Sequence, residues 1–112
     1  MGGLISTFGA VRYPNVFGKV GAFSPAYWFA LNDLNNYIST STTTISNVRI
    51  SHVAGQNESG SMVSNINSVS TQLFIRGLVN SNSQIKIDAD GTHTEAYWRR
   101  EFGAAYQWLF PD

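Results

Sequence analysis

Apolar residues recur at helical spacing in four stretches of the chain and gather in short runs in three others. In the first stretch, Leu4, Phe8 and Val11 share one face of a helix predicted over residues 2–13. The other predicted helices cover residues 24–38, 61–76 and 92–109, and the short runs predict buried strands at 19–23, 47–54 and 84–88.

Three sets of residues predict where helices begin and end. Ser24-Pro25 is typical of a helix start, with serine as the N-cap and proline at the first helical position. Thr92 and Glu95 have the spacing of a capping box. Gly77 follows the third helix and is expected to be its C-cap.

Helices and strands alternate along the whole chain, which predicts an α/β fold. The strands should be parallel, joined by right-handed crossovers, with helices on both faces of the sheet. We expect about three strands in a single partial domain over residues 1–112. A parallel sheet normally needs cover on every side. The first strand, residues 19–23, has nothing in this chain to pair with along one edge.

Composition limits the classes of function. The chain is 43% hydrophobic and 13% aromatic, which favours a packed globule over disorder. Seven Lys and Arg residues balance seven Asp and Glu residues, so charge gives no reason to expect nucleic acid or an anionic membrane as partner. No apolar run of about 18 residues is present to span a membrane. The N-terminus lacks the pattern of a signal peptide, and the compartment is left open.

The sequence predicts no metal and no cofactor. The absence of cysteine excludes thiolate chemistry and Cys-ligated zinc. The two histidines, His52 and His93, are far apart in sequence and make a poor zinc site. Residues 88–91 are too short for a calcium loop. His52 alternates with strand residues and is expected to be structural or solvated, while Trp98 and Trp108 have the helical spacing of core residues.

Three polar residues follow the three predicted strands. Ser24, Glu58 and His93 come after the first, second and third strand, where open parallel sheets place their working sites. An acid followed by a histidine is the acid–base half of a hydrolase triad, in which the carboxylate orients the imidazole for proton transfer. The residues alone leave open a solvated Glu58 and a His93 that only hydrogen-bonds at a helix start.

Three segments carry a resemblance to a known family. Residues 13–28 (YPNVFGKVGAFSPAYW), 54–59 (AGQNES) and 90–99 (DGTHTEAYWR) resemble the C-terminal half of the putative-esterase family of α/β-hydrolases, which includes feruloyl and enterochelin esterases and mycolyltransferase-like proteins. The resemblance implies a truncated α/β-hydrolase fold. It also implies that His93 is the catalytic histidine and Glu58 the triad acid.

The start of the chain departs from the family pattern. In the family, the segment that residues 1–6 (MGGLIS) resemble follows directly on the nucleophilic serine. We therefore expect the nucleophile and most of the oxyanion hole to be missing, with weak or re-routed ester hydrolysis at most. Ser24 and the amino group of Met1 are candidate substitutes for the serine, and Ser6 and Ser59 are weaker ones.

Partners follow from the same observations. A small ester is the expected substrate if hydrolysis occurs. The unpaired first strand and the first helix predict self-association, because an open apolar strand edge invites pairing with another chain. A non-catalytic self-associating domain is thus the alternative function. A third possibility is a gene fragment translated from an internal methionine.

Overall fold

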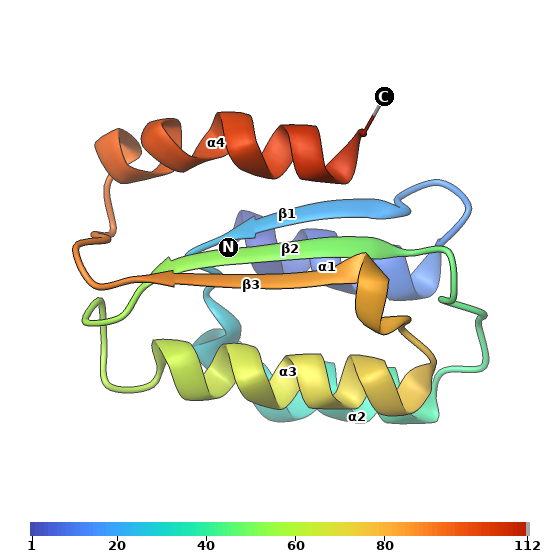
Figure 1. The fold of residues 1–112 in the computed structure, drawn as a ribbon. Helices are drawn as coiled ribbons and strands as arrows, with labels where there is room; N and C mark the ends of the chain where they lie inside the picture. The colour runs from blue at the N-terminus through green and yellow to red at the C-terminus, as the bar shows by residue number, and fades with distance from the viewer. Residues whose placement is uncertain (112) are drawn as a thin grey trace.

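A computed structural model describes residues 1–111, which form one parallel sheet with helices on both faces (Figure 1). The α/β prediction of about three parallel strands is confirmed. The elements in chain order are α1 (Gly2–Arg12), β1 (Lys19–Phe23), a 3-10 turn (Tyr27–Phe29), α2 (Leu31–Thr40), β2 (Arg49–Gly55), α3 (Met62–Arg76), a second 3-10 turn (Asn80–Asn82), β3 (Ser83–Asp88) and α4 (Glu95–Leu109).

The strands lie in the order β1-β2-β3, so β2 is central. Val20 is level with Ile50, and Ile50 is level with Ser83. Because the strands are parallel, all three end at the same edge of the sheet. The loops that follow them therefore lie together.

The two faces of the sheet are covered unequally. Helices α1, α2 and α3 lie on one side, and α4 lies alone on the other (Figure 1). The larger core joins the sheet to α1, α2 and α3, and includes Val20 and Ile50. A smaller core beneath α4 contains Val53, Tyr97 and Ala105. The hydrophobic core on the α4 face of the sheet is therefore the smaller of the two.

The chain after β1 differs from the sequence prediction. A helix was expected to start at Ser24 with its hydroxyl as N-cap, but a short 3-10 turn comes first and α2 begins only at Leu31. The Ser24 N–H donates to the carbonyl of Val53 at 2.7 Å, so strand pairing extends one residue past β1. Ser24 then takes φ 46°, a left-handed conformation incompatible with a helix start.

Helix α4 also begins later than the capping-box spacing predicts. Thr94, not Thr92, is the N-cap, and its hydroxyl accepts the N–H of Tyr97. The hydroxyl of Thr92 instead contacts that of Thr94 at 2.8 Å. The buried face of α4 carries Tyr97 and Ala105, while Phe102 is 58% exposed. Gly77, in contrast, ends α3 at φ 123° as predicted.

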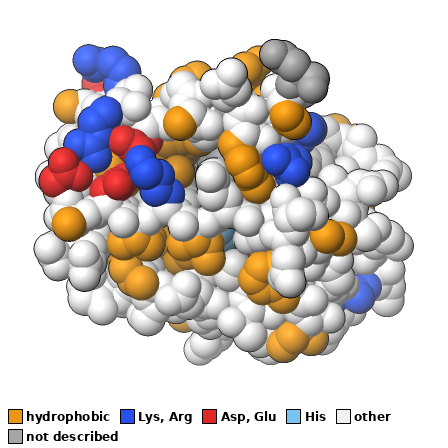
Figure 2. All heavy atoms as spheres, in the orientation of Figure 1, with side chains coloured by type: hydrophobic (Ala, Val, Ile, Leu, Met, Phe, Trp, Pro, Cys, Tyr) orange, Lys and Arg blue, Asp and Glu red, His pale blue; other side chains and the backbone are white. Residues whose placement is uncertain are grey.

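Charged side chains fasten α4 to β3. Figure 2 shows Lys, Arg, Asp and Glu side chains gathered at one corner of the molecule. Lys86 of β3 pairs with Glu101 of α4, and Arg100 bonds to both Glu101 and Asp90. At the other end of α4, Lys19 and Arg49 donate to its last carbonyl groups. Both ends of the helix are therefore held to the sheet.

No helix within residues 1–111 has the length and apolar character needed to cross a membrane.

Candidate active site

His93 and Glu58 meet beyond the carboxyl ends of the strands. Glu58 lies in the loop after β2, and His93 lies in the loop between β3 and α4. The Nδ1 atom of His93 is 2.9 Å from Oε1 of Glu58. The side chain of Glu58 is 1% exposed, whereas that of His93 is 64% exposed. A buried acid thus holds one nitrogen of an accessible imidazole.

Two glycines let the loops approach closely enough for this contact. A Cβ atom on Gly55 would collide with the backbone of Gly91. A Cβ on Gly91 would in turn lie 2.7 Å from both the Cα of Gly55 and the ring of Tyr97. The backbone N–H of Gly91 also donates to the carbonyl of Asp88 at 3.2 Å. Glycine at both positions is therefore needed for the acid loop to touch the histidine loop.

The carboxylate of Glu58 has a defined set of donors. Its Oε2 accepts the N–H of Gly55 at 2.6 Å and the hydroxyl of Ser24 at 2.7 Å, which leaves Oε1 for His93. Burial alone would raise the pKa of Glu58. The bonds from Gly55, Ser24 and His93 outweigh that effect and lower its pKa below the ordinary value. Glu58 is therefore ionised at neutral pH and can accept a hydrogen bond from the Nδ1–H of His93.

His93 presents its second nitrogen away from the acid. Within residues 1–111, no hydrogen bond joins Nε2 of His93 to another group. The ring of Trp98 packs edge-on against the imidazole, with 5.0 Å between ring centroids and 82° between planes. With Nδ1 bonded to a carboxylate, the imidazole carries its lone pair on Nε2. This is the nitrogen that acts as general base in a triad.

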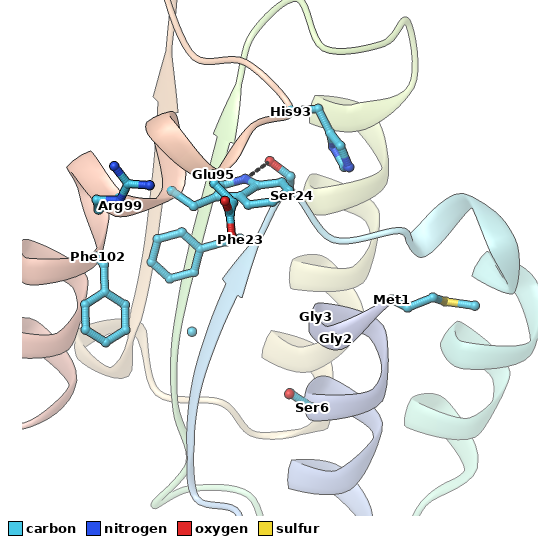
Figure 3. A pocket seen from close by; sticks show the side chains of 12 residues that line it. Met1, Gly2, Gly3, Ser6, Phe23, Ser24, His93, Glu95, Arg99 and Phe102 are labelled. Atoms are coloured by element: carbon cyan, nitrogen blue, oxygen red, sulfur yellow. Dashed lines mark hydrogen bonds between the residues drawn. The ribbon is translucent and has the colours of Figure 1, made fainter.

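A cavity of about 660 Å³ opens beside the His93 imidazole (Figure 3). One wall is the N-terminal turn of α1, including Met1, Gly2 and Gly3. The opposite wall is formed by Trp98 and Phe102 of α4. The exposed strand residue Gly21 lies between them. This arrangement places an open space next to the exposed imidazole of His93.

The candidate nucleophiles occupy different positions around this cavity. The Ser24 hydroxyl is buried and bonded to Glu58, not to His93. Met1 and Ser6 line the cavity, and the side chain of Met1 extends away from Ser24 in Figure 3. Ser59 lines a second hollow, of about 300 Å³, on the side of His93 that faces Trp28. The use of any of these groups as a nucleophile stays a prediction.

Trp98 is a site residue that the sequence interpretation assigned to the core. Its indole N–H donates to the hydroxyl of Ser24 at 2.9 Å, the bond drawn as a dashed line in Figure 3. Its ring also contacts His93. A signal was available in the sequence, since Trp98 lies one helical turn after Thr94, the cap residue next to His93. A tryptophan there faces the histidine loop.

His52, the other histidine, is fully buried within β2, on the face of the sheet that α1 covers. Its Nε2 is 2.7 Å from the hydroxyl of Tyr27, which also contacts Thr7 at 2.8 Å. Burial lowers the pKa of His52 to about 4, so the ring is neutral near pH 7. Its Nδ1 has no hydrogen-bond partner in the described part of the chain. The prediction that His52 is structural fits this position.

Within residues 1–111 no three His, Cys, Asp or Glu side chains gather closely enough to hold an ion.

Fold and site together define an α/β protein with a carboxylate–histidine pair at the ends of parallel strands. Comparison with known families gives the more particular assignment: the family model described as "Putative esterase" matches residues 1–109. The chain belongs to this esterase family, as its three segments predict.

One relative among curated proteins extends this result. The uncharacterized protein YbbA of Bacillus subtilis (strain 168) is 26% identical over 117 residues, a match that covers 98% of this chain and 46% of YbbA. The chain thus spans about half the length of the curated relative it matches. No solved structure matches.

Proposed function

We propose that this chain carries the acid and the histidine of a Ser-Glu-His triad, Glu58 and His93, without the nucleophilic serine among its own 112 residues. The contact that supports this most strongly is the 2.9 Å bond between Nδ1 of His93 and the buried carboxylate of Glu58. Membership of the esterase family supports carboxylic ester hydrolysis as the reaction type.

Taken alone, the chain is proposed to hydrolyse esters weakly or by another route. A positioned acid–base pair contributes roughly 10²–10⁴ to a rate, while the remaining stabilisation in a serine esterase comes from the nucleophile and the oxyanion hole. In the re-routed alternative, the neutral amine of Met1 would attack the ester carbonyl and expel the alcohol, which leaves Met1 acylated after one turnover. In the main route, His93 would deprotonate water through its free Nε2. Water then attacks the ester carbonyl, and the imidazolium returns its proton to the departing alcohol.

Hydrolysis of p-nitrophenyl acetate tests this proposal. Wild-type protein should exceed the buffer rate, and His93→Ala should lose that excess. An N-terminally acetylated form separates the routes, because its loss of activity implicates the Met1 amine and its retention implicates water. Asn57→Ala is the matched control, since Asn57 is exposed in the acid loop next to Glu58. Unchanged hydrolysis in His93→Ala would overturn the proposal.

The open edge of β1 favours a second candidate function, self-association. Because the N–H of Ser24 and the carbonyl of Gly18 bond to β2, the alternate residues Gly21 and Phe23 direct their backbone groups to the free edge. Unpaired strand edges pair readily with other chains. Exposed apolar residues of α4 lie beside this edge: Phe102, whose ring is 6.4 Å from that of Phe23, is 58% exposed, and the neighbouring Tyr106 is 54% exposed.

A symmetric dimer through β1 and α1 would join two such sheets and cover these residues. Light scattering at tens of micromolar should then give twice the monomer mass. Phe102→Glu should shift the protein toward monomer. Ile75→Glu, which alters a more exposed apolar residue, at 73%, on α3, should not. A monomer in the wild type would exclude this candidate without affecting the first.

A further inference from the structure

Ser24 is the only non-glycine residue among residues 1–111 with a positive φ, at 46°. A left-handed backbone disfavours side chains with a Cβ, and glycine would relieve the strain. Strained residues persist where the surrounding structure fixes them, and they gather at functional sites. The strain at Ser24 is therefore a reason to ask what its hydroxyl does.

The hydroxyl of Ser24 has one donor and one acceptor. Trp98 donates its indole N–H to Oγ at 2.9 Å, and Oγ lies 2.7 Å from Oε2 of Glu58. Since an indole nitrogen donates only, Ser24 must direct its own hydrogen to the carboxylate. Ser24 is 3% exposed, so water does not compete for these bonds. The two hydrogen bonds therefore run in one direction: Trp98 donates to Ser24, and Ser24 donates to Glu58.

We propose that Ser24 and Trp98 are positioning residues that hold the carboxylate of Glu58 in the rotation that offers Oε1 to His93. With the Gly55 N–H also on Oε2, two donors hold one oxygen and leave the other free for the imidazole. Trp98 acts at both ends of this arrangement, because its ring edge also packs against His93. Three elements far apart in sequence, the residue after β1, the acid loop and α4, thereby fix one proton-transfer geometry.

This inference rests on the proposed function for its purpose, but its structural content is measurable without catalysis. Carbon-13 NMR of the labelled Glu58 side-chain carboxyl reports its proton affinity directly. Removing the Ser24 hydroxyl takes away a hydrogen bond to the ionised carboxylate. The proton affinity of Glu58 should rise roughly tenfold, since one charge-assisted bond is lost.

Two variants of Ser24 separate positioning from folding. Ser24→Ala removes the hydroxyl and keeps the strained backbone, whereas Ser24→Gly removes the hydroxyl and relieves the strain. Both should raise the proton affinity of Glu58 by a similar factor, although Ser24→Gly should be the more stable protein. Equal proton affinity of Glu58 in wild type and Ser24→Gly would overturn the inference.

Trp98→Phe keeps a ring against His93 and removes only the indole N–H. It should raise the proton affinity of Glu58 by a smaller factor, about twofold to threefold, because Ser24 can still donate. Trp108→Phe is the matched control, as Trp108 lies on the same helix but stacks on Arg49 away from the site. It should leave the Glu58 titration unchanged. A change as large as that in Trp98→Phe would refute the specific role of Trp98.

Ester hydrolysis by the same proteins is a separate readout. If wild type hydrolyses p-nitrophenyl acetate, both Ser24 variants should lower the hydrolysis rate several-fold. They should also move the acid limb of the pH–rate profile to higher pH. If wild type is inactive, the proposed function fails, and the Glu58 titration still decides the positioning role.

Discussion

The two histidines have opposite environments: His93 lies in the loop after β3, whereas His52 lies within β2. His93 is 64% exposed and bonds to an ionised carboxylate, whereas His52 is fully buried and bonds to the hydroxyl of Tyr27. Each ring uses one nitrogen for one side-chain partner. The difference lies in solvent and charge: an accessible ring beside an acid can gain and lose protons, while a buried ring beside a phenol stays neutral.

The comparison shows that the partner and the burial of a histidine matter more than its presence near a strand. His93 follows β3 and His52 lies within β2 of the same sheet. Among the described residues, neither belongs to a group of three side chains that could hold a metal ion. His93 should therefore govern activity with little effect on stability. His52 should govern stability with no direct part in the reaction.

The largest effect should come from Glu58→Gln. A glutamine fills the same space, but its amide turns toward Nδ1 of His93 as a donor, which forces the imidazole into the other tautomer. Nε2 then carries the proton and cannot act as a base, so the variant should lose the roughly 10²–10⁴ that the acid–base pair contributes. Hydrolysis should fall to that of His93→Ala.

Thermal unfolding of Glu58→Gln is the accompanying control for folding. Hydrolysis equal to wild type in a folded Glu58→Gln would mean that His93 acts as an ordinary surface imidazole. That result would remove the functional contrast between the two histidines.

The next effect concerns pH and His52. The unfolded chain binds a proton at His52 below about pH 6.5, but burial lowers the folded-state pKa to about 4. Between these values the unfolded state holds more protons, so stability rises with pH and is lost as pH falls from 6.5 toward 4. The loss is on the order of 3 kcal/mol.

Urea unfolding at several pH values measures this dependence. His52→Gln should flatten the plot of unfolding free energy against pH above pH 4.5, where the titration of carboxylates contributes little to the slope. Identical slopes in wild type and His52→Gln would show that His52 titrates normally and that its burial carries no penalty.

The smallest effect concerns the cap beside His93. Thr94→Ala removes the hydroxyl that accepts the N–H of Tyr97 and should destabilise the protein by about 1 kcal/mol. Thr92→Ala, which removes a hydroxyl that accepts no backbone N–H of α4, should cost less. Chemical denaturation of both variants decides whether Thr94 or Thr92 is the cap. Equal losses would contradict the assignment.

Much of the fold followed from local pattern. Apolar spacing located β1 at residues 19–23 and the buried face of α3, because burial of one face requires that spacing. It failed after β1, where the N–H of Ser24 pairs with Val53, a residue 29 positions away. No local signal reports such a contact. The same limit applies to the start of α4, where the capping-box spacing of Thr92 and Glu95 favoured Thr92 but the structure uses Thr94.

The sequence by itself determined the chemical groups of the site and their order: an acid after the second strand and a histidine after the third. It also determined the family. Tertiary structure alone decided that Oε1 of Glu58 faces His93, that Ser24 serves the carboxylate, and that Trp98 joins both. The physical reason is that hydrogen-bond direction and burial depend on side chains brought together by the sheet. Spacing along the chain carries neither.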